Sequence, residues 1–373
     1  MNNAKGWNSD FMIESCDAGS LPFKGDFNKF SEGASNYTRV TNASTLFFEN
    51  KIASGFIDKA NAGIDVPNYP QYRDMTQMFI DMIDGLIKTN GGYAETDTLA
   101  LEAGQGLIPE IQAVNNRSKE IHESLGQPYR LRICITGPYT ISSLLAFKDK
   151  NTFTRLGNVL AQIIDANDFN TRYGGVKLVS IDEPVFGLVD DPLLDRGSEG
   201  RENLLKAWET IMQKIRAKGA QTCLHLHSAS DELFWQTKSL NIIESHVNDS
   251  FYQAKRTKDK LEETDKFLKA SIAITDFDKL IMNHIKDKHA ELSGIALNQK
   301  IADTWKNINA GKVDPATFFE GIEVMKQRLK QAIEKFGENR IPYAGTECGM
   351  RGFPTYQSAI EYLRKVSEAT RAP

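Results

Sequence analysis

Short apolar stretches rich in β-branched residues alternate along the chain with longer stretches in which apolar residues recur every three to four positions. The first kind predicts buried strands, and the second predicts amphipathic helices. Eight strands are expected, at Phe11–Ser15, Ile64–Val66, Arg130–Thr136, Val176–Ile181, Gln221–His227, Asn241–Glu244, Ala270–Thr275 and Ile341–Gly345. The clearest helical stretches are Leu46–Ala62, Met75–Lys88, Phe153–Ala166, Leu204–Lys218 and Tyr356–Ala369.

The order of these elements predicts the fold class. Because most of the strands are followed by a helix, we expect them to run parallel to one another. The sequence therefore predicts an α/β fold, a single (β/α)₈ TIM barrel in which residues 1–373 form one domain with helical insertions. Tyr93–Val114 and Asp314–Phe336 are expected as insertions or extra helices.

Composition narrows the class of protein. Of the 373 residues, 40% are hydrophobic and 25% are charged, which is typical of a soluble globular protein. A formal net charge of −4 argues against nucleic acid or an anionic membrane as a partner. No apolar run approaches the length of about 18 residues that a membrane span needs. Met1–Asp10 is polar and lacks the apolar stretch of a signal peptide, and four cysteines are too few for a disulfide framework. We expect a cytoplasmic location.

Barrel enzymes carry their catalytic groups at the C-terminal ends of the strands and in the loops that follow. In this chain the same edge collects polar and metal-binding side chains. They are Asp17, Ser20, Asp182, Glu183, His225, His227, Glu244, Asp276 and Cys348. The candidate site is therefore expected at this edge.

The densest signal is the pair His225 and His227 on one predicted strand. Alternate residues of a strand point to the same face, so both imidazoles are expected to face the barrel interior. The competing interpretation is a pair of hydrogen-bonded core histidines. Cys223 shares this face one layer deeper, where core packing accounts for it.

Glu244 and Cys348 stand at the ends of two later strands. A carboxylate that closes a buried strand needs a charged partner or a metal. Glycines around Cys348 allow the chain to turn sharply and place the sulfur at the barrel mouth. The alternatives are an exposed loop carboxylate and an inert, half-buried cysteine. Nitrogen, oxygen and sulfur ligands together suit Zn²⁺.

Six short motifs occur in order along the chain, at Gly19–Pro22, Thr136–Pro138, Ile181–Pro184, His225–His227, Ile243–Ser245 and Glu347–Gly349. Together they resemble the catalytic C-terminal half of cobalamin-independent methionine synthase. The resemblance covers nearly the whole chain. A short, single-barrel form of this kind is similar to archaeal and some bacterial methionine synthases and to epoxyalkane:coenzyme M transferase.

The resemblance implies a zinc site. In the family, zinc is bound by a His-x-Cys strand, a glutamate and a late cysteine. The corresponding positions here are His225, His227, Glu244 and Cys348. His227 departs from the family pattern, although imidazole is also a competent zinc ligand.

The resemblance also implies a substrate site. Gly19 and Ser20 would contact the carboxylate of homocysteine, and Asp182 would contact its amino group. A second family contact to the amino acid is a glutamate, and Tyr69 stands in its place, which leaves coenzyme M or another thiol open. The family's proton-donating histidine aligns with Asp278, so Asp182 and Asp278 are the candidate catalytic residues.

The implied function is zinc-dependent methyl transfer to a small thiol, with homocysteine giving methionine. The donor is expected to be methylcobalamin on a methyl-corrinoid protein, or a methylated pterin. One alternative is a zinc thiol-alkyl transferase of the coenzyme M type. Another is a metal-free lyase like uroporphyrinogen decarboxylase, which would use Arg39, Arg73 and Arg351 to bind carboxylates. A third is a non-catalytic zinc-binding or ligand-binding barrel.

Two segments that contain aromatic residues near the predicted barrel mouth each have two interpretations. Phe234 and Trp235 are expected either to stack on a flat donor or to pack in the core. Pro67–Arg73 is expected to form either a loop over the mouth or a surface connection.

Overall fold

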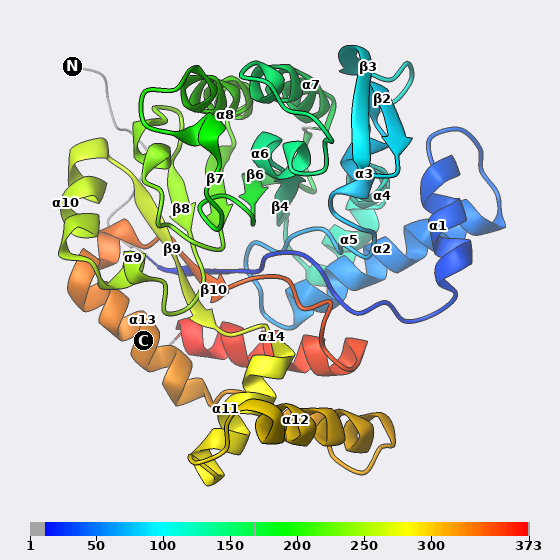
Figure 1. The fold of residues 1–373 in the computed structure, drawn as a ribbon. Helices are drawn as coiled ribbons and strands as arrows, with labels where there is room; N and C mark the ends of the chain where they lie inside the picture. The colour runs from blue at the N-terminus through cyan, green and yellow to red at the C-terminus, as the bar shows by residue number, and fades with distance from the viewer. Residues whose placement is uncertain (1–11, 168, 372–373) are drawn as a thin grey trace.

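A computed structural model describes residues 12–371, apart from residue 168. Its centre is a sheet of seven parallel strands in the order β1-β10-β9-β8-β7-β6-β4 (Figure 1). The strands are β1 (Glu14–Cys16), β4 (Tyr129–Thr136), β6 (Gly174–Glu183), β7 (Gln221–Leu226), β8 (Ile242–Glu244), β9 (Phe267–Ala273) and β10 (Tyr343–Thr346), and a short β5 (Asn170–Thr171) pairs antiparallel with β6. These strands overlap the predicted ones, although Phe11 lies outside the described residues.

A short extended segment around Pro67 holds the eighth position of the barrel. Val66 forms one parallel bridge with Cys16 of β1, and Asn68 forms one with Arg132 of β4. Proline has no backbone N–H to donate, so the segment cannot form a continuous ladder with its neighbours. The predicted (β/α)₈ barrel is confirmed, with two isolated bridges where the second strand was expected.

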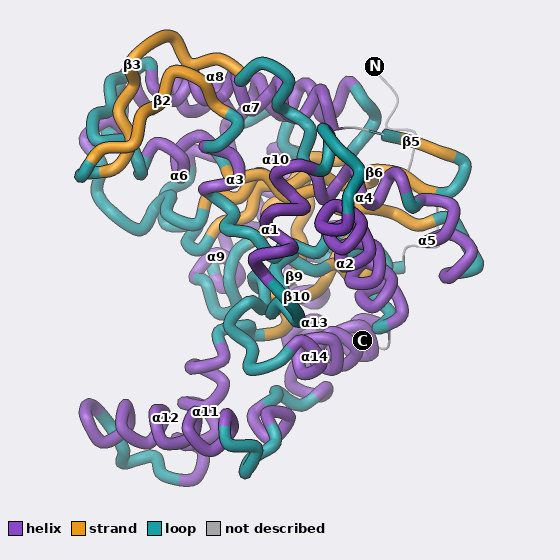
Figure 2. Tube along the Cα trace, turned by 90° about the vertical axis from the view of Figure 1, so that its right-hand side faces the viewer, coloured by secondary structure: helices purple, strands orange, loops and turns teal. Residues whose placement is uncertain are grey.

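Helices cover the outside of the barrel (Figures 1 and 2). They are α1 (Phe27–Asn36), α2 (Ala43–Asn61), α3 (Gln77–Ile80), α4 (Pro109–Asn116), α5 (Ser118–Leu125), α6 (Pro138–Ser142), α7 (Thr152–Asn167), α8 (Glu199–Ala217), α9 (Ser250–Gln253), α10 (Lys255–Thr264), α11 (Phe277–Lys288), α12 (Gly294–Asn309), α13 (Ile322–Phe336) and α14 (Tyr356–Arg371). The helices predicted in the regions of α2, α7, α8 and α14 are confirmed. Asn42 caps α2 and Ser198 caps α8, because their side chains accept hydrogen bonds from the first free backbone N–H groups.

One predicted helix is wrong. Within Met75–Lys88 only the single turn of α3 is helical, and the chain continues as β2 (Ile83–Thr89). This strand pairs antiparallel with β3 (Gly92–Leu101) to form a hairpin, of which only β3 overlaps the region Tyr93–Val114 expected as an insertion. Asn90-Gly91 connects the two strands, and this dipeptide favours the tight turns of β-hairpins. The apolar residues of this stretch recur at helical spacing, and they therefore predicted a helix in spite of the Asn90-Gly91 turn that follows.

The interior of the barrel is built in layers. The lowest is a small apolar cluster of Cys16, Val66, Leu178, Cys223, Ile242 and Tyr343. Cys223 is therefore a packing residue, as expected. Buried polar side chains contact this cluster, because Nη1 of Arg132 lies 3.5 Å from Sγ of Cys16 and Sγ of Cys223 lies 3.7 Å from Oε2 of Glu244.

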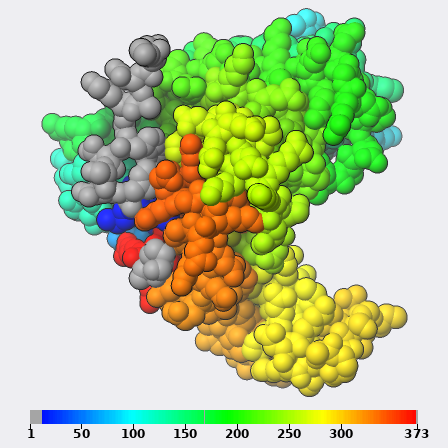
Figure 3. Space-filling view, turned by 90° about the vertical axis from the view of Figure 1, so that its left-hand side faces the viewer, coloured from blue at the N-terminus to red at the C-terminus, as the bar shows by residue number. Residues whose placement is uncertain are grey.

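Two additions rise from this mouth. The hairpin β2–β3 follows the segment around Pro67, and α11 with α12 follows β9, so both leave from C-terminal strand ends. Figure 2 shows the hairpin and α12 projecting on the same side of the molecule, and Figure 3 shows the α11–α12 region standing away from the body. In the described part of the chain, no helix is long and apolar enough to cross a membrane.

Candidate metal centre

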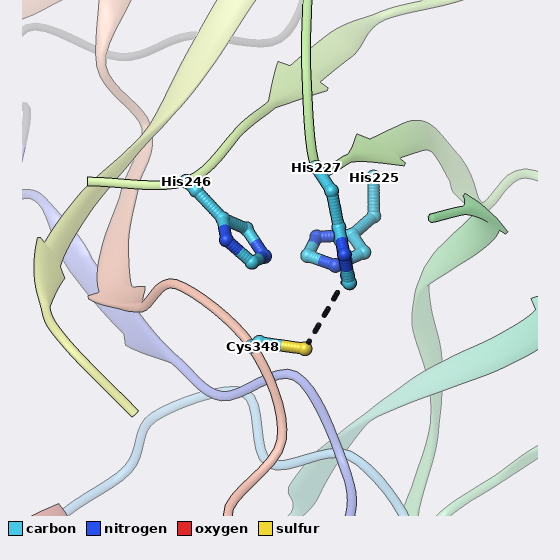
Figure 4. Close-up of side chains that lie close together, drawn as sticks. All are labelled: His225, His227, His246 and Cys348. Carbon is cyan, nitrogen blue, oxygen red and sulfur yellow. Dashed lines mark hydrogen bonds between the residues drawn. The ribbon is translucent and has the colours of Figure 1, made fainter. Parts of the chain in front are cut away.

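Four metal-binding side chains meet at the barrel mouth (Figure 4). His225 lies in β7, His227 follows it, His246 follows β8, and Cys348 follows β10. One ligand atom from each lies within 4.8 Å of the others. The structure therefore brings together three of the four predicted ligands, and it adds His246.

The parallel register of β7 and β8 explains why the histidines meet. His225 is the register partner of Glu244, so two residues further along each chain His227 and His246 stand side by side. Their ring centroids are 4.0 Å apart. Sequence reasoning missed His246, although its spacing from Glu244 repeats that of His225 and His227.

The loop after β10 is fixed by close contacts with the loop after β1. The backbone N–H of Met350 donates to the carbonyl of Ser20 at 2.7 Å. A Cβ atom at Gly349 would lie 2.0 Å from Oγ of Ser20, so only glycine fits there. Glu347 adds a second anchor, because its carboxylate accepts hydrogen bonds from the backbone N–H groups of Val247 and Thr275. These contacts fix the position of Cys348.

Two of the imidazoles are neutral at pH 7. Burial, followed by repulsion from His225, lowers the pKa of His227 to about 2 and that of His246 to about 4. Burial also opposes the charge on His225, but the nearby Glu244 carboxylate outweighs it and raises the pKa of His225 to about 10. Neutral imidazole is the form that binds a metal, and a bound metal replaces the proton of a charged one.

The donor set fits a metal ion. Nε2 of His246 is buried and has no hydrogen-bond partner among the described residues. A buried polar atom without a partner is costly unless a ligand or water satisfies it. Three imidazoles and one thiolate are donors that Zn²⁺ accepts in tetrahedral geometry.

Glu244, the fourth predicted ligand, is engaged elsewhere. Its Oε1 lies 2.6 Å from Nζ of Lys269 and 3.0 Å from Nδ1 of His225, and its Oε2 lies 2.9 Å from Nη2 of Arg132. The contact with His225 is a charge contact without the alignment of a hydrogen bond. Arg132 and Lys269 hold the pKa of this buried carboxyl well below its usual range, against the effect of burial.

Two of the predicted substrate residues, Gly19 and Ser20, lie beside the Cys348 loop. The carboxylate of Asp17 accepts a hydrogen bond from the backbone N–H of Gly19 and pairs with the buried ammonium of Lys59 at 2.7 Å. The same ammonium donates to the carbonyl of Gly19 at 2.6 Å. This pair fixes the loop, which also needs glycine because Gly19 has a φ of +110°.

The other two predicted substrate-binding residues, Asp182 and Tyr69, are buried. Asp182 lies next to the last residue of β6 as the register partner of His225, and its Oδ1 accepts a hydrogen bond from Ser180 at 2.6 Å. Burial raises the pKa of Asp182. Tyr69 is fully buried, and its hydroxyl donates to the carbonyl of Cys134 at 2.9 Å. The Tyr69 hydroxyl is thus used within the fold.

A cavity of about 330 Å³ opens beside the metal-binding group. His246 and Cys348 line it together with Phe277, Asp278 and Trp305. Asp278 is exposed, and its Oδ1 accepts a hydrogen bond from the indole N–H of Trp305 at 2.6 Å. The predicted acid–base residue therefore lies at the entrance to the site, on α11.

Three other expectations are settled by burial and pairing. Phe234 and Trp235 are buried, which favours the core interpretation. Residues 67–72 are buried as well, and Gln71 forms a bridge with Ser20, so the segment packs against the loop after β1 and is not a surface connection. Arg73 forms two contacts with the buried Glu110, at 2.7 and 2.8 Å, and its charge is therefore already balanced. This weakens the cationic pocket that a metal-free lyase would need.

Comparisons with solved structures agree with the fold. A B12-independent methionine synthase from Shewanella sp. W3-18-1, in complex with selenomethionine, superposes with a TM-score of 0.59 at 14% identity, over 96% of this chain and 97% of that one. A protein from Listeria monocytogenes assigned as a vitamin-B12 independent methionine synthase gives 0.58 at 13% identity, over 97% and 98%. At these identities the likeness shows a shared fold. No family model and no curated protein matches the sequence.

Proposed function

We propose that this protein is a zinc-dependent methyltransferase that transfers a methyl group to a small thiol, with homocysteine as the acceptor and methionine as the product. The observation that carries the proposal is the group of His225, His227, His246 and Cys348 at a barrel mouth, beside a cavity. Catalytic groups of barrel enzymes lie at this end. The fold shared with methionine synthases supports the same reaction class.

The four side chains would hold Zn²⁺, and the substrate thiol would enter by displacing one of them or by expansion to five-coordination. When bound, the ion would supply a Lewis acid that keeps the substrate thiol as the nucleophilic thiolate at neutral pH. The protein's own part is to keep two imidazoles neutral by burial and to fix Cys348 through the Ser20 and Glu347 contacts. Rigid ligands let the acceptor sulfur be aimed toward the cavity where the methyl donor is bound.

The amino-acid end of homocysteine would lie between two neighbouring loops. The backbone at Gly19 and Ser20 would hold the carboxylate, and Asp182, the register partner of His225, would hold the ammonium group. Asp278 lies on the cavity side, where it would meet the donor rather than the thiol. The donor would be methylcobalamin, carried on a methyl-corrinoid protein, or a methylated pterin.

One observation supports a second acceptor. Tyr69 stands where the resemblance implies a glutamate, and its hydroxyl is bound to the Cys134 carbonyl, so this position offers no carboxylate to an ammonium group. A thiol without an amino group, such as coenzyme M, is therefore the second candidate.

Metal analysis followed by a thiol panel tests the proposal. Purified protein should contain one zinc per chain, and with zinc present it should methylate homocysteine from methylcobalamin or a methylated pterin. Methylation of coenzyme M but not of homocysteine would mean that the acceptor is another thiol, while the proposed zinc-dependent methyl transfer would still hold. Protein that binds no zinc would overturn the proposal.

A further inference from the structure

A buried charged layer lies directly beneath the candidate metal centre. Arg132 on β4, Glu244 on β8 and Lys269 on β9 each have 0% side-chain exposure. Two cations therefore face one carboxylate, and each oxygen of Glu244 has a cationic partner, at 2.6 Å for Oε1 and 2.9 Å for Oε2.

This pairing restricts what Glu244 can do. To reach a metal beside His246, the carboxylate would have to leave Arg132 or Lys269, and the cation left behind would be buried without its counter-charge. Such an unpaired buried charge is strongly destabilising. His246 already supplies the fourth donor of the group above.

We propose that Arg132 and Lys269 keep Glu244 off the metal, so that Glu244 is a positioning residue for His225 and not a ligand. The inference rests on the proposed metal site. Oε1 of Glu244 lies 3.0 Å from Nδ1 of His225, which leaves Nε2 as the nitrogen for the metal. A carboxylate on the second nitrogen of a metal-binding histidine fixes the orientation of its ring.

The same two cations also connect Glu244 to the rest of the site. Nζ of Lys269 donates to the carbonyl of Thr346 at 2.7 Å, two residues before Cys348. Nη2 of Arg132 donates to Oγ of Ser180 at 3.0 Å, and Ser180 in turn donates to Asp182. One buried network therefore supports a ligand histidine, the loop of the ligand cysteine and the predicted substrate carboxylate.

The consequence is a centre with three neutral imidazoles and a single anionic ligand, the Cys348 thiolate. A glutamate ligand would add a second negative charge and weaken the attraction for a further anionic donor. By keeping Glu244 off the metal, the network would leave a bound ion electrophilic enough to take a substrate thiolate.

X-ray absorption of the full chain loaded with Co²⁺ tests this assignment, with two variants that keep side-chain size. Wild type should give one sulfur donor and three imidazoles, counted from the outer-shell scattering of the rings because X-ray absorption does not separate nitrogen from oxygen donors. Glu244→Gln should keep all four donors and bind Co²⁺ about 10–100-fold more weakly, the usual loss when an outer partner of a ligand is changed. Lys269→Met should free Oε1 of Glu244 to enter the Co²⁺ shell, so the number of donors should rise with three imidazoles retained, and the visible absorption of the tetrahedral ion should fall.

Three results would count against the inference or its premise. A wild-type shell with only two imidazoles, which loses one nitrogen or oxygen donor in Glu244→Gln and is unchanged in His246→Ala, would make Glu244 a ligand and overturn the inference alone. A Lys269→Met protein with the shell and Co²⁺ affinity of wild type would overturn the role of the cations. Wild type that takes up no Co²⁺ would overturn the proposed function as well, and so the two failures are distinguishable.

Discussion

The sulfur of Cys348 lies 3.7 Å from Nε2 of His227, although 121 positions separate the two residues in the chain. The two belong to loops that follow β7 and β10 and turn inward over the barrel mouth (Figure 4). The predictions for Cys348 and Gly349 and the closing test depend on this meeting of distant strand ends.

Removing the thiol should disable metal binding without unfolding the protein. Cys348→Ala should weaken Zn²⁺ affinity by about 100-fold or more, because even an outer partner of a ligand contributes about 10–100-fold. Cys134→Ala, which changes a buried cysteine of β4, is the matched control and should bind Zn²⁺ normally. Competition with a chromogenic chelator measures both. Equal affinity in the two variants would remove Cys348 from the ligand set.

Gly349 should be essential for the shape of the Cys348 loop. Gly349→Ala places a Cβ 2.0 Å from Oγ of Ser20, whereas Gly352→Ala meets nothing within 4 Å. The first variant should lose metal affinity and about 1–3 kcal/mol of stability, as expected for overpacking. The second should match wild type in a thermal melt and a Zn²⁺ titration. Two indistinguishable variants would show that the contact with Ser20 does not shape the loop.

The buried pair of Asp17 and Lys59 should stabilise the loop after β1, which contains Gly19 and Ser20. Lys59→Met leaves the Asp17 carboxylate without its cation and should cost about 3–5 kcal/mol in the free energy of unfolding. Adding Asp17→Asn should recover part of this loss, because no unpaired charge then remains. Urea denaturation of the single and double variants measures the coupling. Strictly additive losses would mean that the two charges do not interact.

Asp278 should matter for one methyl donor and not for the other. A methylated pterin leaves through a nitrogen that must gain a proton, while methylcobalamin leaves without one. Asp278→Asn keeps an oxygen for the Trp305 hydrogen bond but cannot donate a proton. It should slow turnover with a methylated pterin about 100-fold and leave turnover with methylcobalamin unchanged. Equal slowing with both donors would exclude the proton-donating role.

The barrel was predictable because its strongest signals are local. The apolar stretches at β4, β6 and β9 are long and bounded by helical patterns, so their order alone indicates a parallel barrel. The hairpin β2–β3 was missed because its apolar residues also fit a helical period, and only the Asn90-Gly91 turn distinguishes the two.

The site was predictable from the residues alone where one strand carries the pattern, and Cys348 was predicted largely from the resemblance. His225 and His227 follow from alternation within β7, which is visible in the sequence. His246 lies beside them because β7 pairs with β8 in a particular register. The register between two strands cannot be predicted from the sequence of either strand alone. The cations that engage Glu244 come from β4 and β9, at positions 112 and 25 residues away. No local pattern links them.

The central claim is that a thiol binds a metal held by the three histidines and Cys348. The most direct test is to add homocysteine to the full chain loaded with one equivalent of Co²⁺ and to record the near-ultraviolet absorption. One sulfur-to-cobalt charge-transfer band should be present before addition, and saturating homocysteine should increase it as a second sulfur binds. A spectrum that saturating homocysteine leaves unchanged would contradict the account.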